Sequence, residues 1–162
     1  YLLFDALGNA SYSFLFTFVP VAILAMFFVP VQSPPSTVSM CVFLVSVGLG
    51  ILLAHYINYT LGLLAFWFKR SVYVNWFLGA FFTLFSGAQV PLWFYPDFLR
   101  KIAMALPFRF VTFEPISIYL GKTDLSGSLQ ILVFQLVWII AFMIIEAFMW
   151  SRAQKVITIQ GG

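Results

Sequence analysis

Four long apolar stretches run along this chain, and charged side chains hardly interrupt them. They cover residues 7–29, 38–68, 72–90 and 129–150, and a helix that crosses a bilayer needs about 20 such residues. Charged residues make up 8% of the chain, against roughly 25% in a soluble domain, which is too few to cover a surface in water. The sequence therefore predicts an all-α membrane protein, with four transmembrane helices in a single domain of residues 1–162.

The segment 91–121, between the third and fourth spans, is divided by proline and glycine into pieces too short to cross a bilayer. Residues 96–106 are expected to form a short amphipathic helix at the membrane interface. Its polar face carries Asp97, Arg100 and Lys101. Its apolar face consists of Phe98, Leu99, Ile102, Ala103 and Leu106.

A second helical piece is expected at 108–120, interrupted by Pro115 and ended by Gly121. Irregular backbone survives at membrane depth only where protein or water covers it. We therefore expect the segment 91–121 to fold as a re-entrant hairpin before the last span. The residues expected to shape it are Gly87, Pro91, Pro96, Pro107, Pro115 and Gly121.

Polar and small residues form one stripe along the second predicted span, at spacings of three, four and seven. The stripe consists of Gly48, His55, Asn58, Tyr59 and Gly62. Because polar groups are costly in lipid, this face is expected to look into the helix bundle. Two interpretations stay open: helix packing with satisfied hydrogen bonds, or a substrate path or proton relay that uses His55.

The third and fourth spans carry polar residues of the same kind. Asn75 and Thr83 share a face of small residues, which favours close packing or dimerisation, with pore lining as the alternative. Gln135 shares a face with Glu146, the only acid inside a span, which is either functional or paired with Lys69 or Arg70. The candidates for a translocation path or for packing are His55, Asn58, Tyr59, Asn75, Thr83, Gln135 and Glu146.

The chain offers little for catalysis, because it has one histidine and one cysteine. The sequence Gly121-Lys122-Thr123 looks like the end of a phosphate-binding loop, but the required earlier glycine is replaced by Ile116. We therefore expect no catalytic, cofactor or metal site on this chain. The net charge of +3 comes from scattered Lys and Arg rather than a basic stripe, so no nucleic-acid partner is expected.

The orientation is expected to place both ends of the chain in the cytoplasm. The positive charges are divided evenly between the two sides of a four-span arrangement, but several of those on the outer side belong to the hairpin rather than to simple loops. The first residue is Tyr1, and we expect that the natural protein has an N-terminal part that precedes it.

An ordered series of short motifs extends over residues 66–121. It consists of Phe66-Trp67-Phe68, Phe85-Ser86-Gly87-Ala88-Gln89-Val90-Pro91-Leu92, Tyr95-Pro96-Asp97-Phe98-Leu99-Arg100, Leu106-Pro107-Phe108, Glu114-Pro115 and Leu120-Gly121. This series resembles the permease subunits of bacterial ABC type-2 exporters, which have six spans. In that family it links the fifth span to the sixth through an extracellular re-entrant hairpin.

The resemblance implies that this chain is the C-terminal four-span portion of such a permease in the bacterial inner membrane. It would be surrounded by lipid and would pair with a second permease subunit, identical or related. Separate ABC ATPase subunits would bind ATP and Mg²⁺ and drive export, and the permease itself would have no catalytic residues. Two alternatives are an intramembrane enzyme that uses His55 and Glu146 on a lipid-linked substrate, and a non-transporting assembly or anchor subunit.

Overall fold

The computed structural model describes residues 34–64 and 71–160, with the backbone alone at 71–75, 78 and 153–160, and short pieces at 8, 11–13, 15–16, 19–20 and 23–24. Its contacts divide the chain into two units, Tyr1–Ser33 and Pro34–Gly162. The described residues of the first unit are helical, and Tyr12 stacks on Phe16 with ring centroids 4.9 Å apart. Most of the predicted span 7–29 lies outside the described residues.

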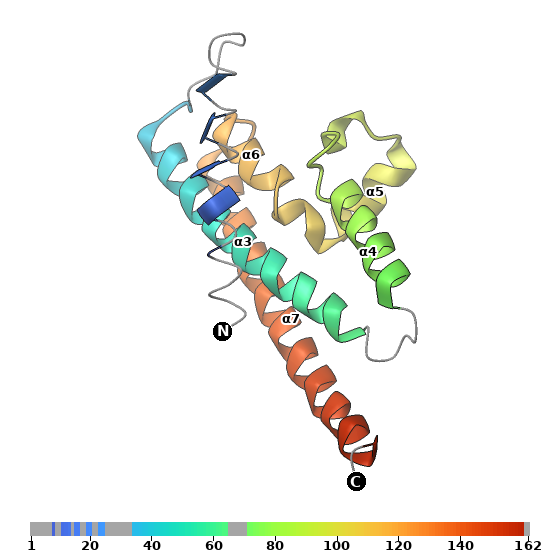
Figure 1. Cartoon of the computed structure of the whole chain (residues 1–162). Helices are drawn as coiled ribbons and strands as arrows, with labels where there is room; N and C mark the ends of the chain where they lie inside the picture. The colour runs from blue at the N-terminus through green and yellow to red at the C-terminus, as the bar shows by residue number, and fades with distance from the viewer. Residues whose placement is uncertain are drawn as a thin grey trace. The chain divides into compact units, whose positions relative to one another are not determined.

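The second unit contains only helices among its described elements (Figure 1). They are α3 (Thr37–Leu64), α4 (Ser71–Phe85), η2 (Leu92–Phe94), α5 (Asp97–Ala105), η3 (Pro107–Phe110), α6 (Phe113–Tyr119) and α7 (Leu125–Gln160). Within the described residues, the stretches Thr37–Leu64 and Leu125–Arg152 are long and apolar enough to cross a membrane. The all-helical class is confirmed, while the four-span arrangement stays a prediction.

Helices α3 and α7 pack side by side and run in the same direction (Figure 1). Near their first turns, Gly121 lies against Pro35, just before α3 and α7 begin. Further along, Ser46 of α3 is hydrogen-bonded to Gln135 of α7. Because sequence numbers rise together on both helices, the chain must return between them, and α4 and the segment 86–121 supply that return.

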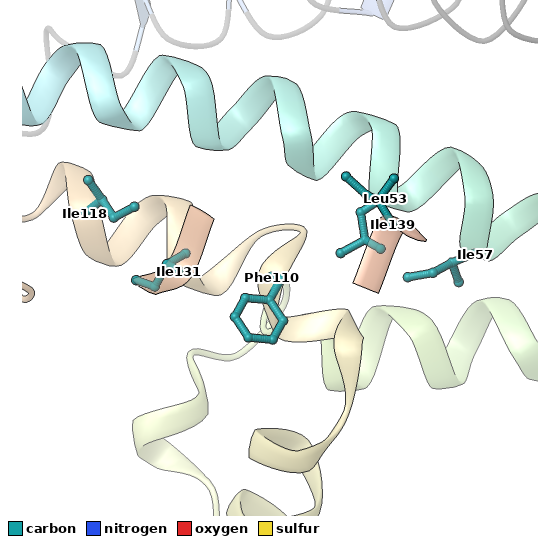
Figure 2. Close-up of a cluster of buried hydrophobic side chains, with 6 residues drawn as sticks. All are labelled: Leu53, Ile57, Phe110, Ile118, Ile131 and Ile139. Carbon is teal, nitrogen blue, oxygen red and sulfur yellow. The ribbon is translucent and has the colours of Figure 1, made fainter. Parts of the chain in front are cut away.

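The core between these helices is a cluster of buried aliphatic side chains with one aromatic ring. Figure 2 shows its six members, which come from α3, η3, α6 and α7: Leu53, Ile57, Phe110, Ile118, Ile131 and Ile139. The cluster therefore ties the segment between the spans to both spanning-length helices. Between helices that cross a membrane, such contacts stabilise the fold through van der Waals packing, because lipid tails are as apolar as these side chains.

Helix α4 ends earlier than expected. The sequence predicted a span to Val90, but the helix ends at Phe85, and Gly87 has a φ of +72°, in the left-handed region that stops a helix. Ser86 closes the turn, because its hydroxyl donates to the carbonyl of Thr83 at 3.1 Å. The 15 residues of α4 are fewer than the about 20 that a perpendicular span needs.

The amphipathic helix predicted at 96–106 is present as α5, Asp97–Ala105. Ala103 is buried, and the charged side chains Asp97, Arg100 and Lys101 are exposed. Phe98 is 75% exposed, and an apolar side chain of a helix at a membrane interface is expected to face lipid. At 100° per residue it lies at the edge of the predicted apolar face that is farthest from Ala103.

The second helical piece differs from the expectation at Pro115. Proline was expected to interrupt a helix over 108–120, but the break lies at 111–112, and Pro115 is the third residue of α6. Its missing N–H removes no hydrogen bond there, because the first turn of a helix has no partners for its N–H groups. The predicted end of this helical piece at Gly121 is confirmed. Gly121 has a φ of +64°, and its N–H donates a hydrogen bond to the carbonyl oxygen of Ile118.

Helix α7 begins at a side-chain cap. The carboxylate of Asp124 accepts a hydrogen bond from the Ser126 hydroxyl at 2.7 Å and another from the Gly127 N–H at 2.9 Å. These two bonds lower the pKa of Asp124. The cap satisfies N–H groups that the first turn would otherwise leave free, and it fixes where the last predicted span starts.

Candidate functional site

Gln135 holds the segment 91–121 to the two long helices. Its side chain is fully buried, and its amide nitrogen Nε2 donates to the carbonyl oxygens of Ser46 at 2.9 Å and Phe110 at 2.8 Å. The Ser46 hydroxyl donates in turn to Gln135 Oε1 at 3.1 Å. Both amide hydrogens and the amide oxygen are satisfied, so one polar side chain joins α3, η3 and α7 inside an apolar core.

A glycine on α3 makes this approach possible. A Cβ atom at Gly50 would lie 3.0 Å from the carbonyl oxygen of Val111 and 3.4 Å from that of Phe110. Ser46 and Gly50 are one turn apart on the same face, which is the small-residue spacing that lets segments pack closely in membranes. The end of η3 therefore lies directly on the α3 backbone.

An ion pair holds the hairpin together from within. Arg109 Nη1 lies 2.6 Å from Glu114 Oε1, and the two side chains are 20% and 8% exposed. The same nitrogen lies 3.1 Å from Met104 Sδ, while the buried Nε of Arg109 has no hydrogen-bond partner. Burial raises the pKa of Glu114, and the positive charge of Arg109 opposes that rise with a smaller effect.

A backbone hydrogen bond joins the turn after α4 to the start of α6. The Phe113 N–H donates to the Ser86 carbonyl at 3.2 Å, and Ser86 is fully buried. A Cβ atom at Gly87 would lie 3.1 Å from Phe113 Cβ and 3.3 Å from Leu92 Cγ. Glycine is thus required at this position for two reasons. Its φ is positive, and the side chains of Phe113 and Leu92 lie too close for a Cβ atom.

Each predicted hairpin proline lies at the start of a helical piece. Pro91 and Pro96 immediately precede η2 and α5, Pro107 is the first residue of η3, and Pro115 lies in the first turn of α6. Proline suits these positions because its fixed φ matches a helix and its missing N–H costs nothing there. The hairpin is therefore a chain of short helices rather than two longer ones.

An open cavity of about 280 Å³ lies at the other end of the α3–α7 pair. It is lined by Tyr56, Tyr59, Met143, Glu146, Ala147 and Trp150. Two of the predicted site residues, Tyr59 and Glu146, therefore meet in space. His55 does not line the cavity; its ring lies beside those of Tyr56 and Tyr59, with centroids 5.7 and 6.4 Å away.

Within residues 34–160, most of the polar stripe of α3 lies away from η3, α6 and α7, and its place in the whole helix bundle stays a prediction. The buried face of α3 consists of Ser46, Gly50, Leu53, Ile57, Thr60 and Leu63. At 100° per residue Gly48, Asn58 and Gly62 lie on the opposite side, whereas Tyr59 lines the cavity against α7. Asn58 and Gly62 are exposed, and a Cβ atom at Gly48 would meet nothing within 4 Å.

Two of the candidate site residues, Asn75 and Thr83, belong to α4. The Thr83 hydroxyl donates to the Gly79 carbonyl of its own helix at 2.8 Å, which satisfies it without a partner from another element. The side chain of Asn75 lies outside the described residues, as do Lys69 and Arg70. The possible pairing of Glu146 with either cation therefore stays a prediction.

Sequence reasoning gave no structural role to four residues that hold the hairpin in place: Ser46, Gly50, Arg109 and Glu114. The spacing of Ser46 and Gly50 was a usable signal, but the parallel stripe of Gly48 and Gly62 competed with it. Arg109 and Glu114 are five residues apart, a spacing that no regular helix brings together, and only the break at 111–112 lets them meet.

Two parallel helices of the described chain, α3 and α7, are long and apolar enough to cross a membrane, and a series of short helices packs between them. The model of the family described as ABC-2 family transporter protein matches residues 2–161, and the chain belongs to that family. It is a membrane permease of an ABC-type system. A search among curated proteins found no match, and a search among solved structures found none either.

Proposed function

We propose that this chain is the transmembrane subunit of an ABC exporter and forms part of its translocation path, driven by a separate ATPase. The observation that carries the proposal is the family match over residues 2–161, nearly the whole chain. The chain would carry no catalytic residue, metal or cofactor of its own. Its partners would be ABC ATPase subunits, which bind ATP and Mg²⁺, and a second permease subunit, identical or related.

The hairpin 91–121 would shape the outer end of the path. Its tip, η3, lies against Gly50 and Gln135, and α6 then leads back to Gly121, beside the start of α3. From Thr37 to Gly50 an α-helix advances about 20 Å, at 1.5 Å per residue. A segment that reaches this far along α3 and returns to the same end supports a re-entrant hairpin between full spans.

The proposed arrangement in the bacterial inner membrane has several passes, with both ends of the chain in the cytoplasm. The parallel course of α3 and α7 supports it, because two inward-running spans require an outward return between them. Lipid would surround the exposed apolar faces of these helices. No nucleic acid would take part.

Affinity co-purification of the full-length protein from native membranes in mild detergent tests the proposal. Mass spectrometry identifies what is recovered, and an ATPase assay measures hydrolysis with and without vanadate. We expect a stoichiometric ABC ATPase and vanadate-sensitive hydrolysis. Recovery of the permease without any ATPase, in every detergent tried, would contradict the proposal.

A further inference from the structure

The cavity between the second halves of α3 and α7 has an uncommon lining for a membrane helix pair. Three aromatic residues, Tyr56, Tyr59 and Trp150, line it together with one acid, Glu146. Met143 and Ala147 are the other residues of its lining in the described part of the chain. In the described part of the chain, no positively charged side chain lines the cavity.

Glu146 has no partner among the described residues. The ion pair of that part of the chain joins Arg109 to Glu114, and Glu146 takes part in no hydrogen bond there. A carboxylate on a membrane helix is costly unless a cation or hydrogen-bond donors compensate it. Among the described residues, the acid of this cavity is therefore left without a compensating positive charge.

The aromatic residues of the lining indicate which class of cation the cavity would bind. The faces of Trp and Tyr rings attract organic cations, and aromatic cages of this type recognise ammonium groups. A small metal ion would need several oxygen ligands, whereas the described lining offers one carboxylate and two phenol hydroxyls. The chemistry fits a weakly hydrated organic ammonium rather than a metal.

We propose that this cavity binds the ammonium group of an amphiphile, either a transported cation or an aminated lipid headgroup. The volume of about 280 Å³ lies just below the range of about 300–1,000 Å³ for drug-sized ligands. It therefore holds a headgroup and leaves a hydrocarbon tail in lipid. The inference rests on the proposed function, because it assigns a ligand class to the permease.

Binding is tested on the full-length permease with its ATPase in nanodiscs, with radiolabelled tetraethylammonium as the probe and empty discs as background. We expect saturable binding. Glu146→Gln, which keeps the side-chain shape, weakens it at least about tenfold, the loss expected for one desolvated charge pair. Trp150→Leu weakens it about twofold to thirtyfold, which corresponds to one cation–π contact.

Two matched variants control for general effects of losing an acid or a tryptophan. Asp97→Asn removes an exposed carboxylate of α5, and Trp76→Leu removes an indole that is 77% exposed on α4. Both bind the probe as the wild type does. An affinity loss in these controls equal to that in the cavity variants overturns the assignment to this cavity.

The lipid composition separates the two sources of the ammonium group. Discs of phosphatidylglycerol alone are compared with discs that also contain phosphatidylethanolamine. Competition by phosphatidylethanolamine identifies a lipid headgroup as the occupant, whereas unchanged probe binding identifies a soluble or transported amphiphile. Both outcomes support an ammonium site.

Two results overturn it: no saturable binding above empty discs, or equal affinity in the wild type and a folded Glu146→Gln. Should that variant not fold, wild-type competition decides, because the uncharged isostere tetraethylmethane must compete far more weakly than tetraethylammonium. Equal competition overturns the proposal. The assay needs no ATP hydrolysis, so its failure is distinct from failure to recover an ATPase.

Discussion

At the scale of single residues, the polar side chains of this chain act in two ways. Gln135 is buried with every donor and acceptor satisfied by α3 and η3. Glu146 lines a cavity and has no described partner. The first arrangement stabilises a fixed structure, and in the proposed site the acid gains a compensating charge when a cation binds.

Replacing Gln135 tests the first arrangement. Gln135→Leu keeps a similar size but leaves the carbonyl of Phe110 without its side-chain donor. We expect the free energy of unfolding to fall by about 1–3 kcal/mol, seen as a lower Tm in detergent. Gln130→Leu on the exposed side of α7 is the control and keeps the wild-type Tm. Equal Tm values for the two variants would contradict the anchoring role.

Glu114 gives a pH dependence with a definite sign. Burial raises its pKa above the usual 4.5, so the folded protein keeps the proton to higher pH than the unfolded chain. The stability that this group contributes is therefore present below pH 4.5 and is lost as the pH rises through the folded pKa.

Thermal unfolding followed by tryptophan fluorescence measures that dependence. We expect Glu114→Gln to remove this part of the pH profile, because glutamine has the shape of the protonated acid and does not titrate. Asp97→Asn, at an exposed acid, keeps the wild-type profile. A Glu114→Gln profile parallel to that of the wild type would show that Glu114 does not titrate in this way.

At the scale of elements, α3 serves as the platform on which the hairpin rests. Its face of small and branched residues meets η3, α6 and α7. Of its polar stripe, Tyr59 faces α7 across the cavity, while Asn58 and Gly62 are exposed. The hairpin reaches α3 at Gly50, where the two backbones are in contact. The position of the hairpin is therefore set by a backbone contact as well as by the amide of Gln135.

Two leucine substitutions one half-turn apart separate packing from helix propensity. Gly50→Leu places a side chain against the carbonyl of Val111, whereas Gly48→Leu points into open space. Both gain helix propensity equally. We expect a lower Tm and faster proteolysis within 91–121 for Gly50→Leu alone. Equal behaviour of the two variants would disprove the close contact.

Changes in the hairpin test its proposed role in transport. Gly87→Leu forces a side chain onto a φ of +72° and into Phe113, and Pro107→Ala loosens the start of η3. We expect both to lower ATP-dependent transport in proteoliposomes while the ATPase still co-purifies. Normal transport in both, at normal expression, would argue against a hairpin that shapes the path.

At the scale of the whole molecule, the parallel course of α3 and α7 gives the proposed topology a relation that can be tested. Both helices begin next to the Gly121 turn, and both continue to the cavity around Glu146. Two parallel spans must have their first residues on one side of the membrane and their last residues on the other. This relation holds whichever side is the cytoplasm.

Cysteine labelling measures this topology. In a Cys41→Ser background, which removes the native cysteine, cysteines at Ser36 and Ser126 react with an impermeant maleimide from one side. A cysteine at Ser151 reacts from the other. For cytoplasmic ends, intact spheroplasts label Ser36→Cys and Ser126→Cys only. Labelling of Ser36→Cys and Ser126→Cys from opposite sides would refute the parallel arrangement.

The sequence by itself determined the features that depend on composition and local chemistry. Sparse charge and long apolar runs require a membrane helix protein, the pattern over 97–105 requires an amphipathic helix, and Gly121 ends α6 through its own backbone freedom. Each follows from side chains within one turn of each other or from their affinity for lipid. The motifs of 66–121 are likewise local patterns in a fixed order. They were enough to identify the family, which the match over 2–161 confirmed.

Only the tertiary structure decided which face of each helix is covered. Both faces of α3 offered small residues, and packing against η3 and α7 selected Ser46 and Gly50 over the polar stripe. The meeting of Tyr59 with Glu146 likewise depends on the register of two helices that are far apart in sequence. Burial and register are properties of pairs of elements, and no single stretch of sequence specifies its partner.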